Sequence, residues 1–236
     1  DNYNRSLQMA TTESLSLPLL AQEFVTEVSQ KHNQKVKVLR KSESWLMRAI
    51  GFILKPFNPT FMEQYITTIG ATIYIPDDFL TSFGEMEVLD VLAHETQHVI
   101  DFTKNRLLFV LGYLFPQCLA LLALLSIFAF LSPWMSLCLL FLLFLAPIPA
   151  PFRYKFEVSG YRTTILFARK VYHYTDEQMA QLYQWVSSQM TTGNYYFAFP
   201  FPGKIAKDLK DESFMLEPRY VEIIDFLKRH GKIQPS

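Results

Sequence analysis

Along most of the chain, hydrophobic and polar positions follow the spacing of helices. Apolar side chains that recur every three or four residues share one helix face. Helices are therefore predicted at about residues 20–28, 45–54, 85–103, 156–174, 175–190 and 218–230. Thr175 is a predicted N-cap, and Gly231 is predicted to end the last helix. The helix at 45–54 also carries Arg48 and Lys55, so two arrangements fit it: packing on the core, or lying flat on a membrane surface.

β-Branched and aromatic residues predict strands in two other places. Residues 36–39 form a short alternating segment, and the stretch from Tyr65 to Pro76 is dense in Ile, Thr and Tyr, with a bend expected near Gly70. Residues 1–16 are polar and rich in Ser and Thr, which predicts a flexible tail. The fold class that follows is α+β, mainly helical.

A long run without charge interrupts these patterns. From Leu107 to Phe152 the sequence has no Asp, Glu, Lys, Arg or His, and Ser132-Pro133-Trp134 divides the run into two apolar arms. A helix that crosses a bilayer needs roughly 20 such residues, so a two-helix membrane hairpin is predicted, with a lipid bilayer as partner. The second arm is short before its proline-rich end, which also fits an oblique or re-entrant segment. The remaining alternative is a buried helical hairpin of a soluble protein.

The charged residues lie outside this run and balance one another. The chain has 22 Lys and Arg and 22 Asp and Glu, so its net charge is zero and nucleic acid is not an expected partner. Lys104 and Arg106 precede the uncharged run, and Arg153 and Lys155 follow it. Because cytoplasmic flanks of membrane segments are enriched in Lys and Arg, both ends of the hairpin are predicted to face the cytoplasm.

Candidate chemistry lies on the predicted helix at 85–103, in the sequence His94-Glu95-Thr96-Gln97-His98. Residues four apart share a helix face, so His94 and His98 can bind one zinc ion while Glu95 lies beside it. Zinc with an open position lowers the pKa of a water ligand to about 7 and polarises a carbonyl, and Glu95 is placed to act as general base. This predicts hydrolysis of a peptide bond in a protein or peptide substrate. The plainer alternative is a helix whose two histidines only form hydrogen bonds with neighbouring groups.

The motif leaves the third metal ligand open. In the metzincin pattern it lies ten residues after the first histidine, where this chain has Lys104, so that subclass is excluded. The remaining candidates are Glu157, His173, Asp101 and Asp176. Asp101 follows His98 too closely on the same helix to reach the same ion easily. Glu157 follows the predicted hairpin, which returns the chain to the side it left, so Glu157 can face the motif.

The order of these pieces resembles the integral-membrane gluzincin endopeptidases related to HtpX and the CAAX prenyl proteases. The resemblance covers roughly Tyr65 to Lys170: an edge-like strand at 71–75, the helix 91–98, two apolar arms, and Phe156-Glu157 opening a later helix. It implies a zincin-like metallopeptidase core with an inserted hairpin at 107–152. The core would comprise residues 17–106 and 153–236. Glu157 would be the third ligand, and a substrate backbone would align along Ala71, Thr72 and Ile73.

One position departs from the family pattern. The family has an aspartate four residues after its ligand glutamate, where this chain has Tyr161. The Tyr161 hydroxyl, Asp90 and Asp101 are the candidates to orient a histidine instead. In the aromatic loop at 193–203, Tyr195 or Tyr196 is a candidate to hydrogen-bond an oxyanion, the alternative being that both only pack.

These observations predict a membrane-associated, zinc-dependent endopeptidase whose site faces the cytoplasm. Two other functions fit the same residues. One is a membrane-inserting structural or virion-type protein that keeps a metallopeptidase fold with little or no turnover. The other is a zinc hydrolase that acts on a lipid or another amide.

Overall fold

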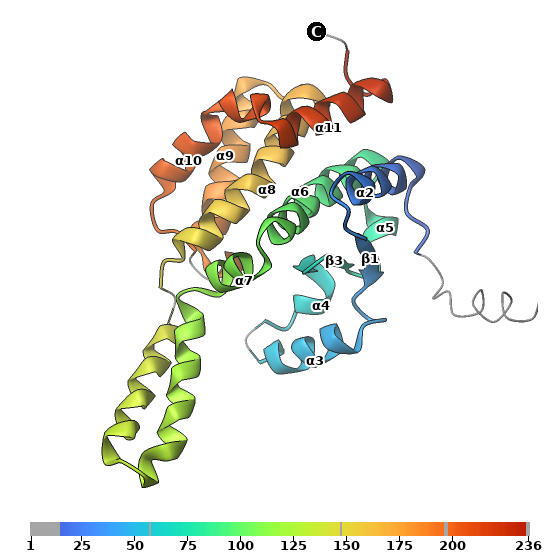
Figure 1. Cartoon of the computed structure of the whole chain (residues 1–236). Coiled ribbons are helices and arrows are strands. Elements are labelled where there is room, and N and C mark those ends of the chain that lie inside the picture. The colour runs from blue at the N-terminus through green and yellow to red at the C-terminus, as the bar shows by residue number, and fades with distance from the viewer. Residues whose placement is uncertain (1–14, 57, 147, 196–197, 235–236) are drawn as a thin grey trace, which may run out of the picture. The chain divides into compact units, whose positions relative to one another are not determined.

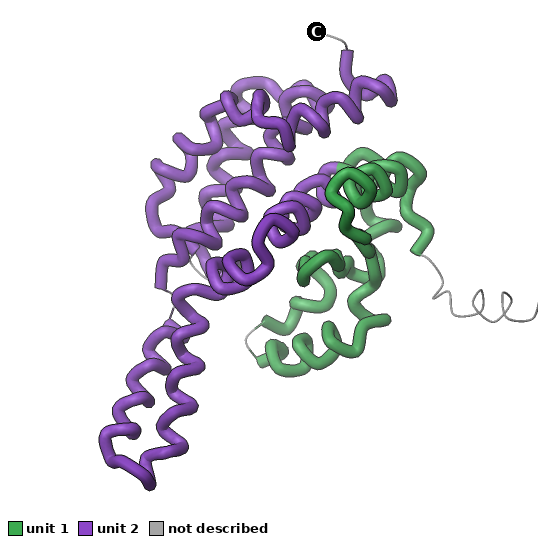
Figure 2. The backbone as a smooth tube through the Cα atoms, in the orientation of Figure 1, with its two compact units in different colours: residues 1–89 green, residues 90–236 purple. Residues whose placement is uncertain are grey.

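The computed structural model describes residues 15–56, 58–146, 148–195 and 198–234. The chain forms two compact units, residues 1–89 and residues 90–236 (Figure 2). Helices predominate, and a small three-stranded sheet lies in the first unit (Figure 1). The predicted mainly helical α+β class is therefore confirmed.

The first unit combines short helices with the sheet. Its elements are α2 (Leu19–Lys31), β1 (Lys37–Arg40), α3 (Trp45–Leu54), α4 (Phe61–Gln64), β2 (Thr67–Ile69), β3 (Thr72–Ile75), α5 (Phe79–Ser82) and the first residues of α6 (Glu85–Lys104). Leu20, Phe24 and Val28 are buried on α2, as their spacing predicts. Ser44 caps α3, because its side chain accepts a hydrogen bond from the Met47 amide.

The strand predicted to lie at a sheet edge lies instead at the centre. The strand order is β1-β3-β2, with β1 parallel and β2 antiparallel to β3. The expectation that 71–75 forms an edge strand is therefore wrong, because the backbone of β3 pairs with β1 on one side and with β2 on the other. Burial gives a physical reason, since Ile73 and Ile75 are fully buried and suit a covered strand. The predicted bend at Gly70 is a turn between β2 and β3, where a φ of 63° suits glycine.

Helix α8 forms much of the core of the second unit. The elements after α6 are α7 (Arg106–Leu114), η1 (Gln117–Phe130), η2 (Pro133–Leu145), α8 (Pro151–Lys170), α9 (Asp176–Thr191), η3 (Gly193–Tyr195), α10 (Pro202–Lys210), η4 (Glu212–Leu216) and α11 (Pro218–Arg229). The Tyr154 hydroxyl on α8 donates to Asp208 on α10, at 2.6 Å, and the Tyr220 hydroxyl on α11 donates to the Ser159 carbonyl, at 2.9 Å. These bonds fix the long helix that carries Glu157.

The ends of α8 differ from the prediction. The predicted start at Phe156 is too late, because Pro151 opens the helix at a position where a missing N–H costs nothing. The predicted end near Tyr174 is too far along, since His173 adopts a left-handed conformation with φ 52°. Thr175 caps α9 as predicted, in a reciprocal capping box with Gln178.

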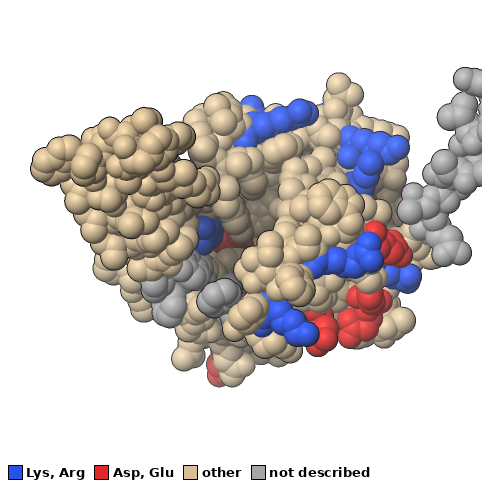
Figure 3. All heavy atoms as spheres, turned by 90° about the horizontal axis from the view of Figure 1, so that it is seen from below, with Lys and Arg blue, Asp and Glu red and all other residues tan. Residues whose placement is uncertain are grey.

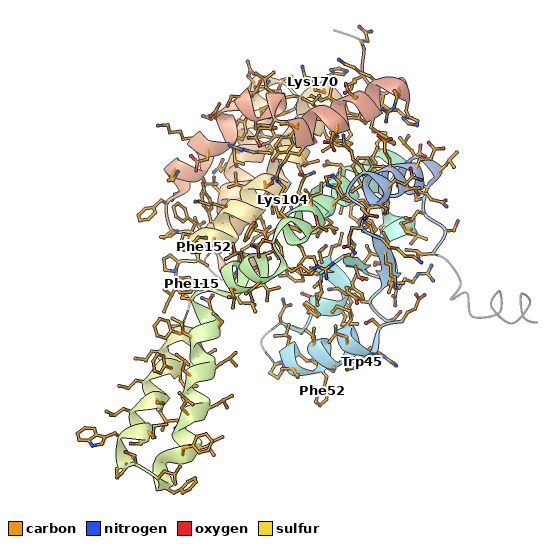
Figure 4. The ribbon with its side chains drawn as sticks, in the orientation of Figure 1. Trp45, Phe52, Lys104, Phe115, Phe152 and Lys170 are labelled. Carbon is orange, nitrogen blue, oxygen red and sulfur yellow. The ribbon has the colours of Figure 1, made fainter. Side chains whose placement is uncertain are left out.

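The uncharged run forms a hairpin that is shorter than predicted. Its two 3-10 helices, η1 and η2, lie side by side (Figure 1). They contain no Lys, Arg, Asp or Glu, and their face in Figure 3 is uncharged. The first arm is not one continuous helix, because the chain bends by 84° between α7 and η1, where Pro116 lacks the N–H that helix continuation needs. At this bend the rings of Phe115 and Phe152 lie edge to face, 6.2 Å apart (Figure 4).

By length and composition, none of the single helices in the described residues could cross a membrane, whereas the bent pair of α7 and η1 could.

Candidate metal centre

Helices α6 and α8 bring three candidate ligands together in the second unit. His94 and His98 are one turn apart on α6 and present their Nε2 atoms to Glu157 on α8. The Glu157 Oε2 atom lies 3.9 Å from His94 Nε2 and 3.7 Å from His98 Nε2. One ligand atom from each residue lies within 4.8 Å of the others, and all three side chains are buried. These three residues could hold a metal ion.

The spacing fits a small divalent ion. Ligand atoms about 2.1 Å from a tetrahedral ion lie ~3.4 Å apart, so the observed distances need to close by only a few tenths of an ångström. Burial lowers the pKa of His94 well below its usual value, and the nearby His98 lowers it further. The imidazole of His94 is therefore neutral at neutral pH, which is the form that binds metals.

A tyrosine that the sequence did not single out orients the carboxylate. The Tyr113 hydroxyl on α7 donates to Glu157 Oε1 at 2.7 Å. This bond leaves the other oxygen, Oε2, directed at the two histidines. A buried carboxylate also needs such a donor, because an unsatisfied charged oxygen is costly away from water.

A buried arginine supports Tyr113. Arg153 Nε donates to the Tyr113 carbonyl at 2.9 Å, and Arg153 Nη2 donates to Gln117 Oε1 at 3.1 Å. The guanidinium carbon also lies 5.3 Å from the centroid of the Tyr113 ring. Arg153 thus joins the start of α8 to the base of the hairpin and holds α7 against the candidate ligands.

Gly160 makes room for His94. A Cβ atom at position 160 would lie 2.4 Å from His94 Nε2 and 2.7 Å from two of its ring carbons. The imidazole therefore packs directly against the backbone of α8. Any larger residue would displace the candidate ligand from its position.

Of the two aromatic candidates that the structure describes, Tyr161 packs on His94 and Tyr195 packs on Tyr161. The Tyr161 ring lies edge to face on His94, with centroids 4.9 Å apart, and its hydroxyl is 3.0 Å from the Tyr195 hydroxyl. Tyr161 therefore fixes His94 by packing, and its hydroxyl pairs with Tyr195 instead of with an imidazole. Burial raises the pKa of both phenols, so both remain protonated and able to donate. Tyr196 lies outside the described residues.

Glu95 lies next to the same group. It is partly exposed on α6, and its negative charge helps burial to raise the pKa of Tyr161. Glu95 directly follows His94 on α6, so it lies beside the candidate ligands, where a general base would be needed.

The rival ligands lie elsewhere. Asp101 accepts a hydrogen bond from Arg219 on α11 at 3.0 Å, His173 is exposed, and Asp176 pairs with Arg169 at 2.9 Å. Within the described residues, His94, His98 and Glu157 form the one group of three or more acidic, histidine or cysteine side chains close enough to share an ion. The expected pairing of an aspartate with a histidine is not found at Asp101. The His98 Nδ1 atom is buried without a hydrogen-bond partner among the described residues.

Tyr113→Phe is expected to weaken zinc binding by about 10- to 100-fold, the usual effect of losing a group that orients a ligand. The substitution keeps the ring, which packs against Phe109 and Phe156, and removes only the donor to Glu157. Competition with a chromophoric chelator would measure the dissociation constant, and Tyr174→Phe, at an exposed ring, is the matched control. An unchanged affinity in Tyr113→Phe would show that the hydroxyl does not orient the ligand.

No known family, curated protein or solved structure matches the chain in comparisons of sequence and fold. The chemistry of the site and the order of its motifs are therefore the guide to what the protein does.

Proposed function

We propose that the protein is a membrane-associated, zinc-dependent endopeptidase. The observation that carries the proposal is the convergence of His94, His98 and Glu157, with Glu95 on the helix of the two histidines. Two imidazoles and one carboxylate are a ligand set of catalytic zinc that leaves a position open. The resemblance of the motif order to the HtpX-related and CAAX prenyl proteases supports the same reaction.

The residues divide the chemistry among them. Held by His94, His98 and Glu157, a zinc ion would supply a Lewis acid and, with one carboxylate ligand, a net single positive charge. Glu95 takes a proton from the attacking water and delivers it to the leaving amine. Tyr195, protonated and hydrogen-bonded to Tyr161, is the candidate donor to the developing oxyanion.

Turnover of an unstructured protein tests the proposal. Purified, zinc-loaded protein is expected to cleave casein, to lose that activity with a chelator and to regain it when zinc is restored. Stoichiometric zinc without cleavage of any peptide library would favour the alternative of a membrane-inserting structural protein with little or no turnover. Cleavage of lipid amides alone would favour the alternative of a zinc hydrolase that acts on a lipid.

The strand positions named for substrate alignment have a weaker basis than the metal ligands. Ala71, Thr72 and Ile73 belong to or adjoin the central strand β3, whose neighbours occupy both edges. A substrate strand cannot add to β3 while β1 and β2 remain paired with it. The proposal therefore assigns no substrate-binding role to these three residues.

The hairpin is proposed to enter the bilayer. Its helices expose many large apolar side chains, including Leu121, Leu124, Ile127, Phe130, Trp134 and Leu143, which water disfavours. Lys104, Arg106 and Lys155 are exposed beside it, whereas Arg153 is buried and tied to Tyr113. The proposal that the site faces the cytoplasm thus depends on three of the four basic residues that flank the uncharged run.

Replacing residues 119–145 with a short Gly-Ser linker is expected to release the protein from membranes washed in high salt. The excision removes most of η1 and η2 but keeps Tyr113, Gln117 and Arg153, so zinc binding should persist. Zinc content and the membrane fraction would be measured on the same preparation. A zinc-binding variant that stays in the washed membranes would contradict the role of the hairpin.

A further inference from the structure

The segment from residue 32 to residue 60 is basic, although the whole chain is neutral. It contains six Lys and Arg and one acidic residue, Glu43, a net charge of 6 − 1 = +5, against zero for the chain. Five of the six basic side chains are exposed: Lys35, Lys37, Arg40, Arg48 and Lys55. The sixth, Lys41, is buried and donates to the Phe61 carbonyl at 2.6 Å. This charge is therefore mostly on the surface of the first unit.

Helix α3 lies inside this basic segment and has one buried face. Met47 and Gly51 are buried, and Gly51 allows α4 to approach, because a Cβ there would lie 2.7 Å from Met62 Sδ. This face binds α3 to the rest of its unit. The opposite face of the helix is consequently directed outwards.

The outward face is apolar and aromatic. Trp45 is 73% exposed, Phe52 80% and Ile53 67%, and the first two project from the ribbon of α3 (Figure 4). Trp45 and Phe52 are seven residues apart, two turns along one side of the helix. Such a concentration of large apolar side chains on one exposed helix face marks a binding surface.

Basic residues border this face. Arg48 lies one turn after Trp45, Lys55 lies one turn after Phe52, and both are exposed. α3 itself has no acidic residue. Helices that lie in the plane of a membrane interface combine Trp and Phe on one side with Lys and Arg beside them.

We propose that the outward face of α3 docks on an anionic lipid bilayer. Trp45, Phe52 and Ile53 enter the boundary between headgroups and acyl chains, while Arg48 and Lys55 bind lipid phosphates and carboxylates. A second copy of this chain is a poorer partner, because the basic residues that border two such faces repel each other. The inference concerns lipid binding by the first unit and does not depend on peptide hydrolysis.

Depth-dependent quenching of Trp45 fluorescence tests this inference in the full chain. The other two tryptophans, Trp134 and Trp185, are replaced by Phe, and the protein is reconstituted with brominated phosphatidylcholine, with or without phosphatidylserine. Trp45 should be quenched, more strongly with phosphatidylserine and less in high salt. Arg48→Gln with Lys55→Gln should lower the ratio of docked to undocked α3 by about 30-fold, whereas Arg48→Lys with Lys55→Arg should preserve it.

A parallel protein that keeps only Trp134, at the tip of the hairpin, separates this result from the fate of the hairpin. Quenching of Trp134 without quenching of Trp45 would overturn the proposal for α3. The proposal would also be overturned if, in the absence of lipid, a concentration-dependent dimer or an acidic protein covered the Trp45 side chain. Quenching of Trp45 alone would support it even if the hairpin stayed outside the bilayer.

Discussion

The Glu157→Ala variant is expected to lose most of its zinc affinity. The loss should exceed the roughly 100-fold decrease in affinity that follows when a group that only orients a ligand is removed. The substitution removes the Oε2 atom that lies 3.9 Å or less from the Nε2 atom of each histidine, and with it the only negative charge among the proposed ligands. Hydrolysis should disappear with the metal. Zinc stoichiometry after gel filtration, measured beside a dissociation constant, would show the loss.

The matched control for Glu157 is His173→Ala. His173 was a rival ligand by sequence, and the structure places it in the exposed turn after α8. Its replacement should leave zinc content unchanged. The assignment would be contradicted if Glu157→Ala kept normal zinc content and His173→Ala lost it.

Glu95→Gln is expected to keep zinc and lower kcat/KM by ~10²- to 10⁴-fold, the usual contribution of a positioned general base. Glutamine has the same shape but does not take up the proton of water, and both imidazoles remain in place. The two measurements should therefore separate: full metal content, and hydrolysis close to background. This pattern differs from that of Glu157→Ala, in which metal and activity fall together.

Glu177→Gln is the control for this charge change, since Glu177 is exposed in the first turn of α9. It should leave both metal content and hydrolysis unchanged. Wild-type turnover in Glu95→Gln would remove Glu95 from the reaction. A joint loss of zinc and activity would show that Glu95 supports the fold of the site instead.

Local pattern was enough to predict the helix that carries the motif. The spacing of apolar residues and the side chains of His94 and His98 lie within one continuous element, so nearby sequence determines their geometry. The cap at Thr175 was predicted for the same reason, because its partner Gln178 is three residues away. Glu157 lies on a different helix, so it was proposed less directly, from the return of the predicted hairpin, the shortage of rival ligands and the resemblance.

The environment of Glu157 could not be predicted in this way. Tyr113 precedes it by 44 residues and lies in an apolar run where a tyrosine attracts no special notice. Arg153 was expected to be a flanking charge, whereas its buried bonds depend on how the hairpin returns. Gly160 has no side chain to mark the close approach of His94.

The errors in the sheet and in the hairpin had different causes. The position of β3 at the sheet centre depends on β1, more than 30 residues earlier, as well as on the adjacent β2. The apolar composition of the run did not show where its helices would stop. The signal was Pro116, which lacks the N–H needed to continue α7 into η1.

Zinc-edge X-ray absorption of the purified protein, with its metal content, tests the central claim most directly. The account predicts one zinc per chain with imidazole nitrogens and carboxylate or water oxygens at about 2.0–2.2 Å, and no sulfur. The oxygen contribution should change in Glu157→Ala. Protein that excludes zinc, or a zinc spectrum with a sulfur ligand near 2.3 Å, would contradict a centre built from His94, His98 and Glu157.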